Sequence, residues 1–336
     1  MARYRRPIVI ALIVLACLGL GEFWLYAANR LGDYMHRRGA MGVSIADLCE
    51  SSDIGGFPFR LKLSCSHFAV PVNFGGQIVT FGAEDVQGLA SLSAPNHVVL
   101  TFSSPMVART ADGASLGKLR HDGMSLDIAW SLTGLSQASL DARALDWRPD
   151  APLAGVALHL QSLKADLTPQ AEGDRSALRF ALAGDGLTAP ALQNLLQKNN
   201  PARFTAEGAI TPAPAPDGDW RSVAEDWRKG AGIVSVDRLQ WTSGDLTLTI
   251  AGALALDDLH RPAGKLSVTS EGAGPLLARL GVPANAAQIN NVLGALLGKA
   301  PDPAAKPNAL TLPLTLANGQ VFLGPIRLPA TVAPLY

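Results

Sequence analysis

Residues 246–256 read Leu-Thr-Leu-Thr-Ile-Ala-Gly-Ala-Leu-Ala-Leu. Large aliphatic side chains occupy every second position, apart from Gly252, and threonine or alanine fills the positions between them. Successive side chains of a β-strand point to opposite faces, so this period of two indicates a strand with one strongly apolar face. The second face is small and uncharged. The stretch predicts a protein built on β-sheet.

The same alternation recurs elsewhere in the chain. Residues 57–66 alternate apolar side chains with Arg60, Lys62 and serines, and residues 124–130 and 310–316 alternate in the same way. Asp-Gly or Asn-Gly pairs, which favour tight antiparallel turns, separate several of these runs. They stand at residues 112–113, 122–123 and 318–319. The pattern predicts hairpins.

Composition supports a large folded domain and argues against nucleic acid as a partner. The 336 residues are 48% hydrophobic, so the chain can bury a substantial core. Its 33 glycines and 23 prolines favour short strands and turns over long helices. Lysine plus arginine (28) balances aspartate plus glutamate (28), which leaves no basic surplus to neutralise phosphates.

We therefore expect an α+β protein that is mostly antiparallel β: one long curved sheet of hairpins, with a few amphipathic helices packed on one side. Apolar residues at helical spacing predict helices at 219–227 and 289–297. Sliding the chain by 94 positions lays Leu145-Asp146-Trp147 over Leu239-Gln240-Trp241. This overlap predicts a weak internal repeat over about 143–210 and 237–325. Chance similarity among alanine- and leucine-rich strands is the alternative.

The N-terminus predicts a membrane anchor. Residues 1–7 carry three arginines and are expected in the cytoplasm, residues 8–28 form a transmembrane signal anchor, and residues 29–41 form a stalk. The anchor is about 20 residues long, enough to cross about 30 Å of hydrocarbon. Glu22 lies near its outer end, where a carboxylate can reach the interface. Cys17 stands in a faint lipoprotein-type cleavage box, so lipidation is the alternative.

Residues 42–336 are expected to form one periplasmic, β-rich domain. Three arginines on each side of the anchor balance, but a long domain is translocated largely regardless of nearby charge. Cys49 and Cys65 enclose 15 residues, a spacing that suits a disulfide worth about 3 kcal/mol. A pair of unpaired buried thiols is the alternative. We expect a single-pass protein of the inner (cytoplasmic) membrane with most of the chain in the periplasm.

Motifs for catalysis lack the context that they need. Residues 113–117 match the hydrolase pattern G-x-S-x-G, but Ser115 stands between a turn and an alternating strand instead of between a strand and a helix. Asp257-Asp258-Leu259-His260 falls between two strands, where turn capping is the ordinary role and a metal corner the alternative. Six scattered histidines and no C-x-x-C argue against zinc. We expect no enzyme, metal or cofactor.

Several short motifs, in order, resemble a bacterial family known as domain of unknown function 2125. They are the arginine-led anchor, Cys49, Gly56-Phe57-Pro58-Phe59-Arg60, Cys65 and residues 319–325. The resemblance implies an envelope protein of Gram-negative bacteria whose molecular role is unassigned, so it assigns no catalytic residue. The glycine-rich, leucine-alternating strands are also similar in texture to AsmA-type envelope proteins, which are associated with lipid traffic.

These observations favour a membrane-anchored envelope protein. A curved sheet with apolar alternate faces can shelter acyl chains, so we expect a groove that binds a lipid or another apolar envelope component. The alternative is a structural or assembly factor with a filled core that docks an envelope protein. The expected partners are the inner membrane, through the N-terminal helix, and one of these two.

Overall fold

The structure is a computed structural model of the chain. It describes residues 19–33, 36, 44, 46–74, 77–91, 93–131, 134–150, 156–172, 175–190, 200–214, 220–272, 309–324 and 326–336.

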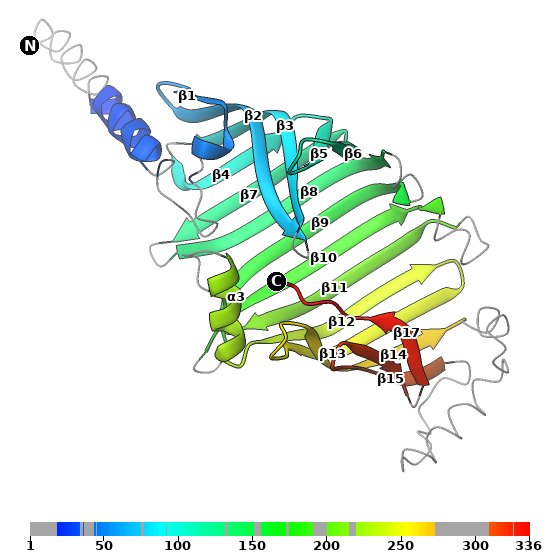
Figure 1. Ribbon diagram of the computed structural model, residues 1–336. Helices are drawn as coiled ribbons and strands as arrows, with labels where there is room; N and C mark the ends of the chain where they lie inside the picture. Colours follow the sequence, from blue (N-terminus) through cyan, green and yellow to red (C-terminus); the bar gives the residue numbers. More distant parts are fainter. Residues whose placement is uncertain are drawn as a thin grey trace, which may run out of the picture.

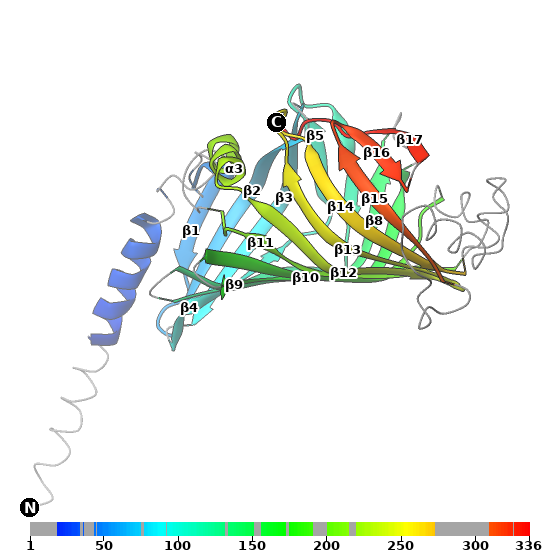
Figure 2. The ribbon, with the colours of Figure 1, turned by 90° about the horizontal axis from the view of Figure 1, so that it is seen from below.

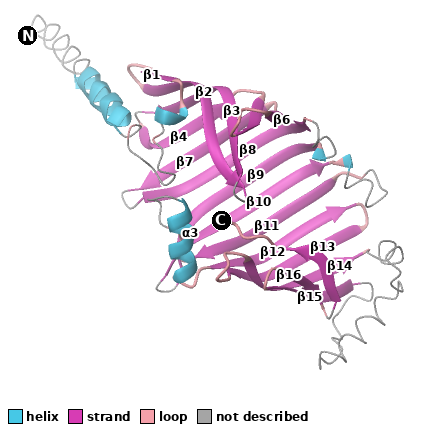
Figure 3. Ribbon diagram, in the orientation of Figure 1, coloured by secondary structure: helices cyan, strands magenta, loops and turns pink. Residues whose placement is uncertain are grey.

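Seventeen strands of the described residues form one sheet, and every pairing in it is antiparallel (Figures 1 and 3). The strands are β1 (Ser51–Gly55), β2 (Arg60–Phe74), β3 (Gln77–Ser91), β4 (Ala94–Phe102), β5 (Met106–Thr110), β6 (Ser115–Arg120), β7 (Gly123–Ser131), β8 (Gly134–Pro149), β9 (Leu158–Glu172), β10 (Arg175–Leu187), β11 (Ala202–Thr211), β12 (Ile233–Ser243), β13 (Leu246–Leu256), β14 (Pro262–Glu271), β15 (Ala309–Ala317), β16 (Gln320–Leu323) and β17 (Ile326–Thr331). The helical elements are residues 19–33, the 3-10 turn η1 (Ala46–Leu48) and α3 (Trp220–Lys229). The predicted class, mostly antiparallel β with one long sheet, is confirmed.

The sheet is a meander in its C-terminal half. In its N-terminal half, two short strands that lie end to end pair together with one long strand. From β8 to β17 each strand pairs with the next one in the chain. β8 also pairs with both β6 and β7, which lie end to end in one row. β4 and β5 form the next row, against β3. β2 and β1 complete the sheet at this edge.

Two of the three predicted tight turns are confirmed and the third is wrong. Positive φ angles occur at Gly113, between β5 and β6, and at Asn318 and Gly319, between β15 and β16. Asp122-Gly123 makes no hairpin, because β6 and β7 lie end to end against β8. The Asp122 N–H donates to the Arg143 carbonyl of β8 at 3.0 Å, so the row continues past this point.

The sheet is strongly curved (Figure 2). β9, β10 and β12 form its base, β1 to β3 rise on one side, and β13 to β16 rise on the other. α3 does not cover a face of the sheet, which corrects, for this helix, the expectation that the amphipathic helices pack on one side. Its Trp227 indole donates to the Pro212 carbonyl just after β11 at 2.9 Å, and its Arg228 binds Asp258 in the β13–β14 turn. α3 therefore lies at the strand ends.

Other predictions fall wholly or partly outside the described residues. These are the cytoplasmic segment 1–7, Cys17 and the first part of the anchor 8–28, most of the stalk 29–41, and the helix at 289–297. Residues 19–33 are helical. Within the part of the chain that is described, no helix has both the length and the apolar character needed to cross a membrane. The repeat over 143–210 and 237–325 remains a prediction.

Candidate functional site: the apolar face of the curved sheet

One face of the sheet is apolar across neighbouring strands. Directly opposed residues of an antiparallel pair carry their side chains on the same face, so the register identifies the members. Ile250 of β13, for example, lies between Leu239 and Val268. Members of this apolar face include Leu167 (β9), Leu178, Phe180 and Leu182 (β10), Phe204, Ala206 and Ile210 (β11), Val234, Leu239 and Trp241 (β12), Leu248, Ile250 and Leu254 (β13), Leu266 and Val268 (β14), and Leu312 and Leu314 (β15).

The apolar face continues through β2 to β10 although the sequence alternation slips by one residue in these strands. In β2 the apolar series Leu61, Leu63, Cys65 resumes at Phe68, and both parts pack in one cluster with Val86. A slip would send the later residues to the opposite face if the backbone stayed regular. A residue with irregular backbone conformation at the slip keeps the later apolar side chains on the same face as the earlier ones.

These irregular positions line up across the strands, and we call the line the crease. It is formed by His67, Ser103, Ser104, His121, Asp122, Ala144, Gln161 and Gly186. His67, Ala144 and Gly186 adopt positive φ of 51°, 50° and 70°. The second cluster, built on Ala142, Leu145 and Leu160, spans the crease in β8 and β9. The crease therefore keeps leucines from both halves of each strand on one face.

Exposure shows that the apolar face is the concave one. Large apolar side chains on the opposite face are exposed, as with Ile78 (47%), Leu89 (41%) and Ile233 (43%). Members such as Phe180 and Ile250 are half-buried instead. No large side chain of the described residues is fully buried. Curvature brings neighbouring side chains together, but within the described residues no second layer covers them.

Two phenylalanines lie flat against glycines on the apolar face. Phe180 of β10 is opposite Gly208 of β11, and Phe204 of β11 is opposite Gly184 of β10. A Cβ built on either glycine would overlap the opposing ring, and one on Gly208 would also overlap the carbonyl oxygen of Ser235. Because glycine has no Cβ, each ring can pack directly over the opposing backbone. The side chains in this part of the face therefore project only a short distance from the sheet.

Ion pairs lie on the opposite, convex face. Arg179 binds Asp237 at 2.6 Å and Arg203 binds Asp185 at 2.8 Å. The hydrogen bond from Arg203 holds the pKa of Asp185 below its ordinary value. These side chains are between 44% and 68% exposed, so each pair adds little to stability. Charge is thus separated from the apolar face.

The predicted signature Gly56-Phe57-Pro58-Phe59-Arg60 lies at one end of the sheet. It forms the turn from β1 into β2, where Gly56 has φ 95° and a Cβ would meet the Arg60 carbonyl oxygen at 2.8 Å. Only glycine fits this close approach without strain. Phe57 and Phe59 are exposed at 59% and 67%.

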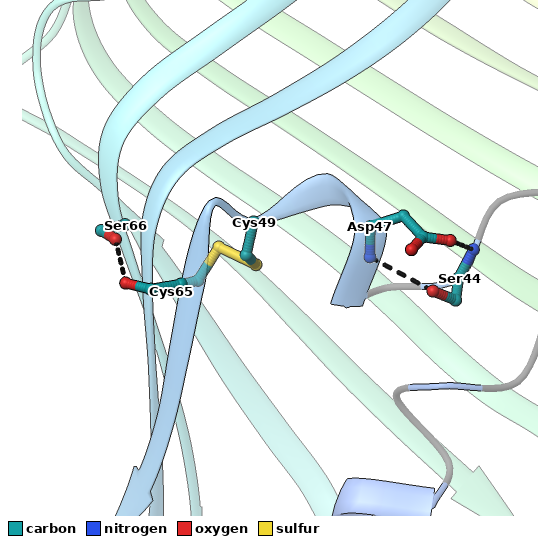
Figure 4. Close-up of a disulfide and its surroundings, with 6 residues drawn as sticks. Ser44, Asp47, Cys49, Cys65 and Ser66 are labelled. Atoms are coloured by element: carbon teal, nitrogen blue, oxygen red, sulfur yellow. Dashed lines mark hydrogen bonds between the residues drawn. A yellow bond between two sulfur atoms is a disulfide. The ribbon is translucent and has the colours of Figure 1, made fainter.

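Cys49 and Cys65 form a disulfide that ties the segment before β1 to β2 (Figure 4). Cys65 is 2% exposed and belongs to the cluster with Ala83 and Val86. Next to the bond, Ser44 and Asp47 cap each other: the Asp47 N–H donates to Ser44 Oγ and the Ser44 N–H donates to Asp47 Oδ2. The disulfide thus fixes the entry into the sheet.

A polar cluster that the sequence did not suggest joins α3 to two distant segments. The Glu225 carboxylate accepts hydrogen bonds from Arg228 at 2.9 Å and from the Tyr336 hydroxyl at 3.2 Å, and lies 3.3 Å from His260 Nε2. His260 and Tyr336 stack with ring centroids 4.3 Å apart. The Arg228 hydrogen bond holds the pKa of Glu225 far below its ordinary value, although partial desolvation opposes this. The cluster fastens the chain end and the β13–β14 turn to α3.

Two motifs considered for chemistry have structural roles. Ser115 begins β6 directly after a turn, and no helix follows it, so no nucleophile elbow is formed. Asp257 accepts hydrogen bonds from the backbone N–H groups of Leu259 and Arg261, both at 2.9 Å, which confirms turn capping. The described residues contain no group of three side chains that could hold a metal ion.

Fold and site together define a class: a β-rich protein whose single curved antiparallel sheet presents one continuous apolar face. The model of one protein family, described as uncharacterized protein conserved in bacteria (DUF2125), matches residues 24–331. Because the match covers most of the chain, this protein belongs to the DUF2125 family. Neither the curated proteins nor the solved structures contain a match to the chain.

Proposed function

We propose that the chain is a membrane-anchored periplasmic protein that holds the acyl chains of a lipid on the concave apolar face. The continuity of that face from strand to strand carries the proposal. A protein without a ligand on this face would leave half-buried leucine and isoleucine side chains facing water. This exposure costs about 25 cal/mol of free energy for each Å² of apolar surface. Acyl chains would remove this surface from water.

The dimensions of the face suit such a ligand. β9 contains 15 residues and therefore extends about 50 Å at roughly 3.3 Å per residue. A bilayer has a hydrocarbon core of about 30 Å, so the acyl chains of one leaflet span about 15 Å. The face is thus long enough for a whole lipid with its headgroup at the rim, and each buried methylene contributes about 0.8 kcal/mol.

The proposed anchor comes from the sequence of residues 8–28, and a periplasmic body agrees with the Cys49–Cys65 disulfide. A binding role, without catalysis, agrees with the capping role of Asp257 and the strand context of Ser115. The competing proposal, a structural or assembly factor with a filled core that docks an envelope protein, draws on the two packed clusters around Cys65 and Ala142.

Photocrosslinking tests the proposal directly. The full chain is expressed in the bacterial envelope with a phospholipid that carries a diazirine on its acyl chain, and crosslinked peptides are mapped by mass spectrometry. We expect crosslinks on apolar-face residues such as Leu248 and Ile250, with Thr247 and Thr249 of the same strand spared. Crosslinks confined to residues 8–28 would contradict lipid binding on the sheet and favour the docking proposal.

A further inference from the structure

The turn of residues 56–59 exposes two large aromatic side chains at one end of the sheet. Phe57 and Phe59 have the exposures given above, and the start of the following strand carries Arg60 and Lys62, which are both exposed as well. Exposed apolar side chains that gather at one place mark an interaction surface more often than scattered ones do. Aromatic rings beside basic groups suit a surface that has an apolar interior beneath an outer layer of anionic groups.

This turn is held against the N-terminal helix. The indole N–H of Trp24 donates to the Arg60 carbonyl at 2.8 Å. The rings of Trp24 and Phe57 meet edge to face with centroids 5.7 Å apart. A Cβ on Gly21 would lie 3.9 Å from the Phe57 ring, so the helix and turn are in van der Waals range there as well. These contacts fix the level of the turn along the helix.

That level coincides with the outer end of the apolar segment 8–28. Trp24 stands four residues before residue 28, and a helix rises 1.5 Å per residue, so the turn lies about 6 Å inside the end of the segment. Around it the helix exposes Phe23 (49%), Leu25 (58%) and Tyr26 (60%). Tryptophan and tyrosine are enriched at this depth, in the interfacial layers of a bilayer.

We infer that Phe57 and Phe59 insert into the interfacial layer of the membrane that holds the anchor, with Arg60 and Lys62 facing the headgroup phosphates. The inference rests on the proposed membrane anchor and deepens the proposed function. The anchor alone would tether the body at a flexible distance, whereas the inserted turn places the β1–β2 end of the sheet on the bilayer surface. Lipid would then reach the apolar face from this end.

Quenching by brominated lipids measures the insertion. The full chain with Phe59→Trp is reconstituted into phosphatidylcholine vesicles whose acyl chains carry bromine close to the headgroups, and the added tryptophan emission is compared with that of the unsubstituted chain. Ile78→Trp is the matched control, because Ile78 is also exposed (47%) but lies at the far end of the β2–β3 hairpin. β2 has 15 residues, so the two positions are up to about 50 Å apart.

We expect the Phe59→Trp emission to lose most of its intensity in brominated vesicles and the Ile78→Trp emission to keep it. Equal emission of Phe59→Trp in brominated and ordinary vesicles would overturn the inference, even if lipid crosslinks to the apolar face. Failure of the chain to float with vesicles would overturn the anchor and the inference together. If Phe59→Trp misfolds by circular dichroism, Phe57→Trp repeats the measurement at the neighbouring ring.

Discussion

Replacing one residue of the apolar face by aspartate should release bound lipid, while the same change one residue earlier should not. Ile250 and Thr249 are neighbours in β13 with side chains on opposite faces: Ile250 lies between Leu239 and Val268, and Thr249 between Gln240 and Thr269. Replacing isoleucine by aspartate at position 250 raises the free energy of transferring this side chain into hydrocarbon by about 3 kcal/mol. This corresponds to about 100-fold weaker lipid binding.

Native mass spectrometry of the full chain, extracted in detergent, measures the bound fraction. We expect a lipid adduct on the unsubstituted chain and on Thr249→Asp, and its loss from Ile250→Asp. Thermal unfolding of both variants controls for damage to the sheet, because each change removes cross-strand contacts worth up to about 1 kcal/mol. An adduct that survives Ile250→Asp, or that Thr249→Asp removes equally, would refute the assignment of the ligand to the apolar face.

Three further predictions concern stability. Gly208→Ala should lower it by about 1–3 kcal/mol, because the added methyl overlaps the Ser235 carbonyl, and an unchanged thermal midpoint would contradict this close packing. The depressed pKa of Glu225 means that its ion pairs stabilise the fold fully above the ordinary value near 4.5 and are lost as the pH falls through the lower, folded value. Tryptophan emission should therefore report loosening of α3 in strong acid, and Glu225→Gln should show that loosened state already at neutral pH; identical acid profiles would count against this role. Changing Cys49 and Cys65 together to alanine should reduce the free energy of unfolding by about 3 kcal/mol, since the loop between them spans 16 positions; a urea midpoint equal to that of the oxidised parent would disprove this.

Alternation in the sequence was enough to predict the class of fold. The Leu246–Leu256 stretch is a strand, and Asn318-Gly319 is a hairpin turn, because both signals are local. The Cys49–Cys65 spacing is equally local. The whole length of β2 was harder to predict, because its alternation breaks after Ser66 and resumes at Phe68. That resumption is visible in the sequence and is the signal that could have revealed the crease.

Contacts between distant segments could not be predicted from local patterns. Glu225, His260 and Tyr336 meet only because α3 lies at the strand ends and the chain returns there. The contact of Trp24 with the turn before β2 is likewise made by the tertiary structure. The tight turn predicted at Asp122-Gly123 was wrong for a related reason. The pair consists of residues that favour such turns, but β8 pairs with both neighbouring strands and holds them end to end.

The crease restricts how these strands can change in length. Loss of Ala144, for example, would return β8 to strict alternation and keep Leu145 on the apolar face, but it would leave one residue of β8 opposite Gln161 and Ser162 of β9. A matching deletion at the facing position of the adjoining strand would restore one-to-one pairing, whereas a single deletion leaves a bulge. Insertions and deletions in related chains should therefore fall in the connecting loops, or occur in coupled pairs along this line.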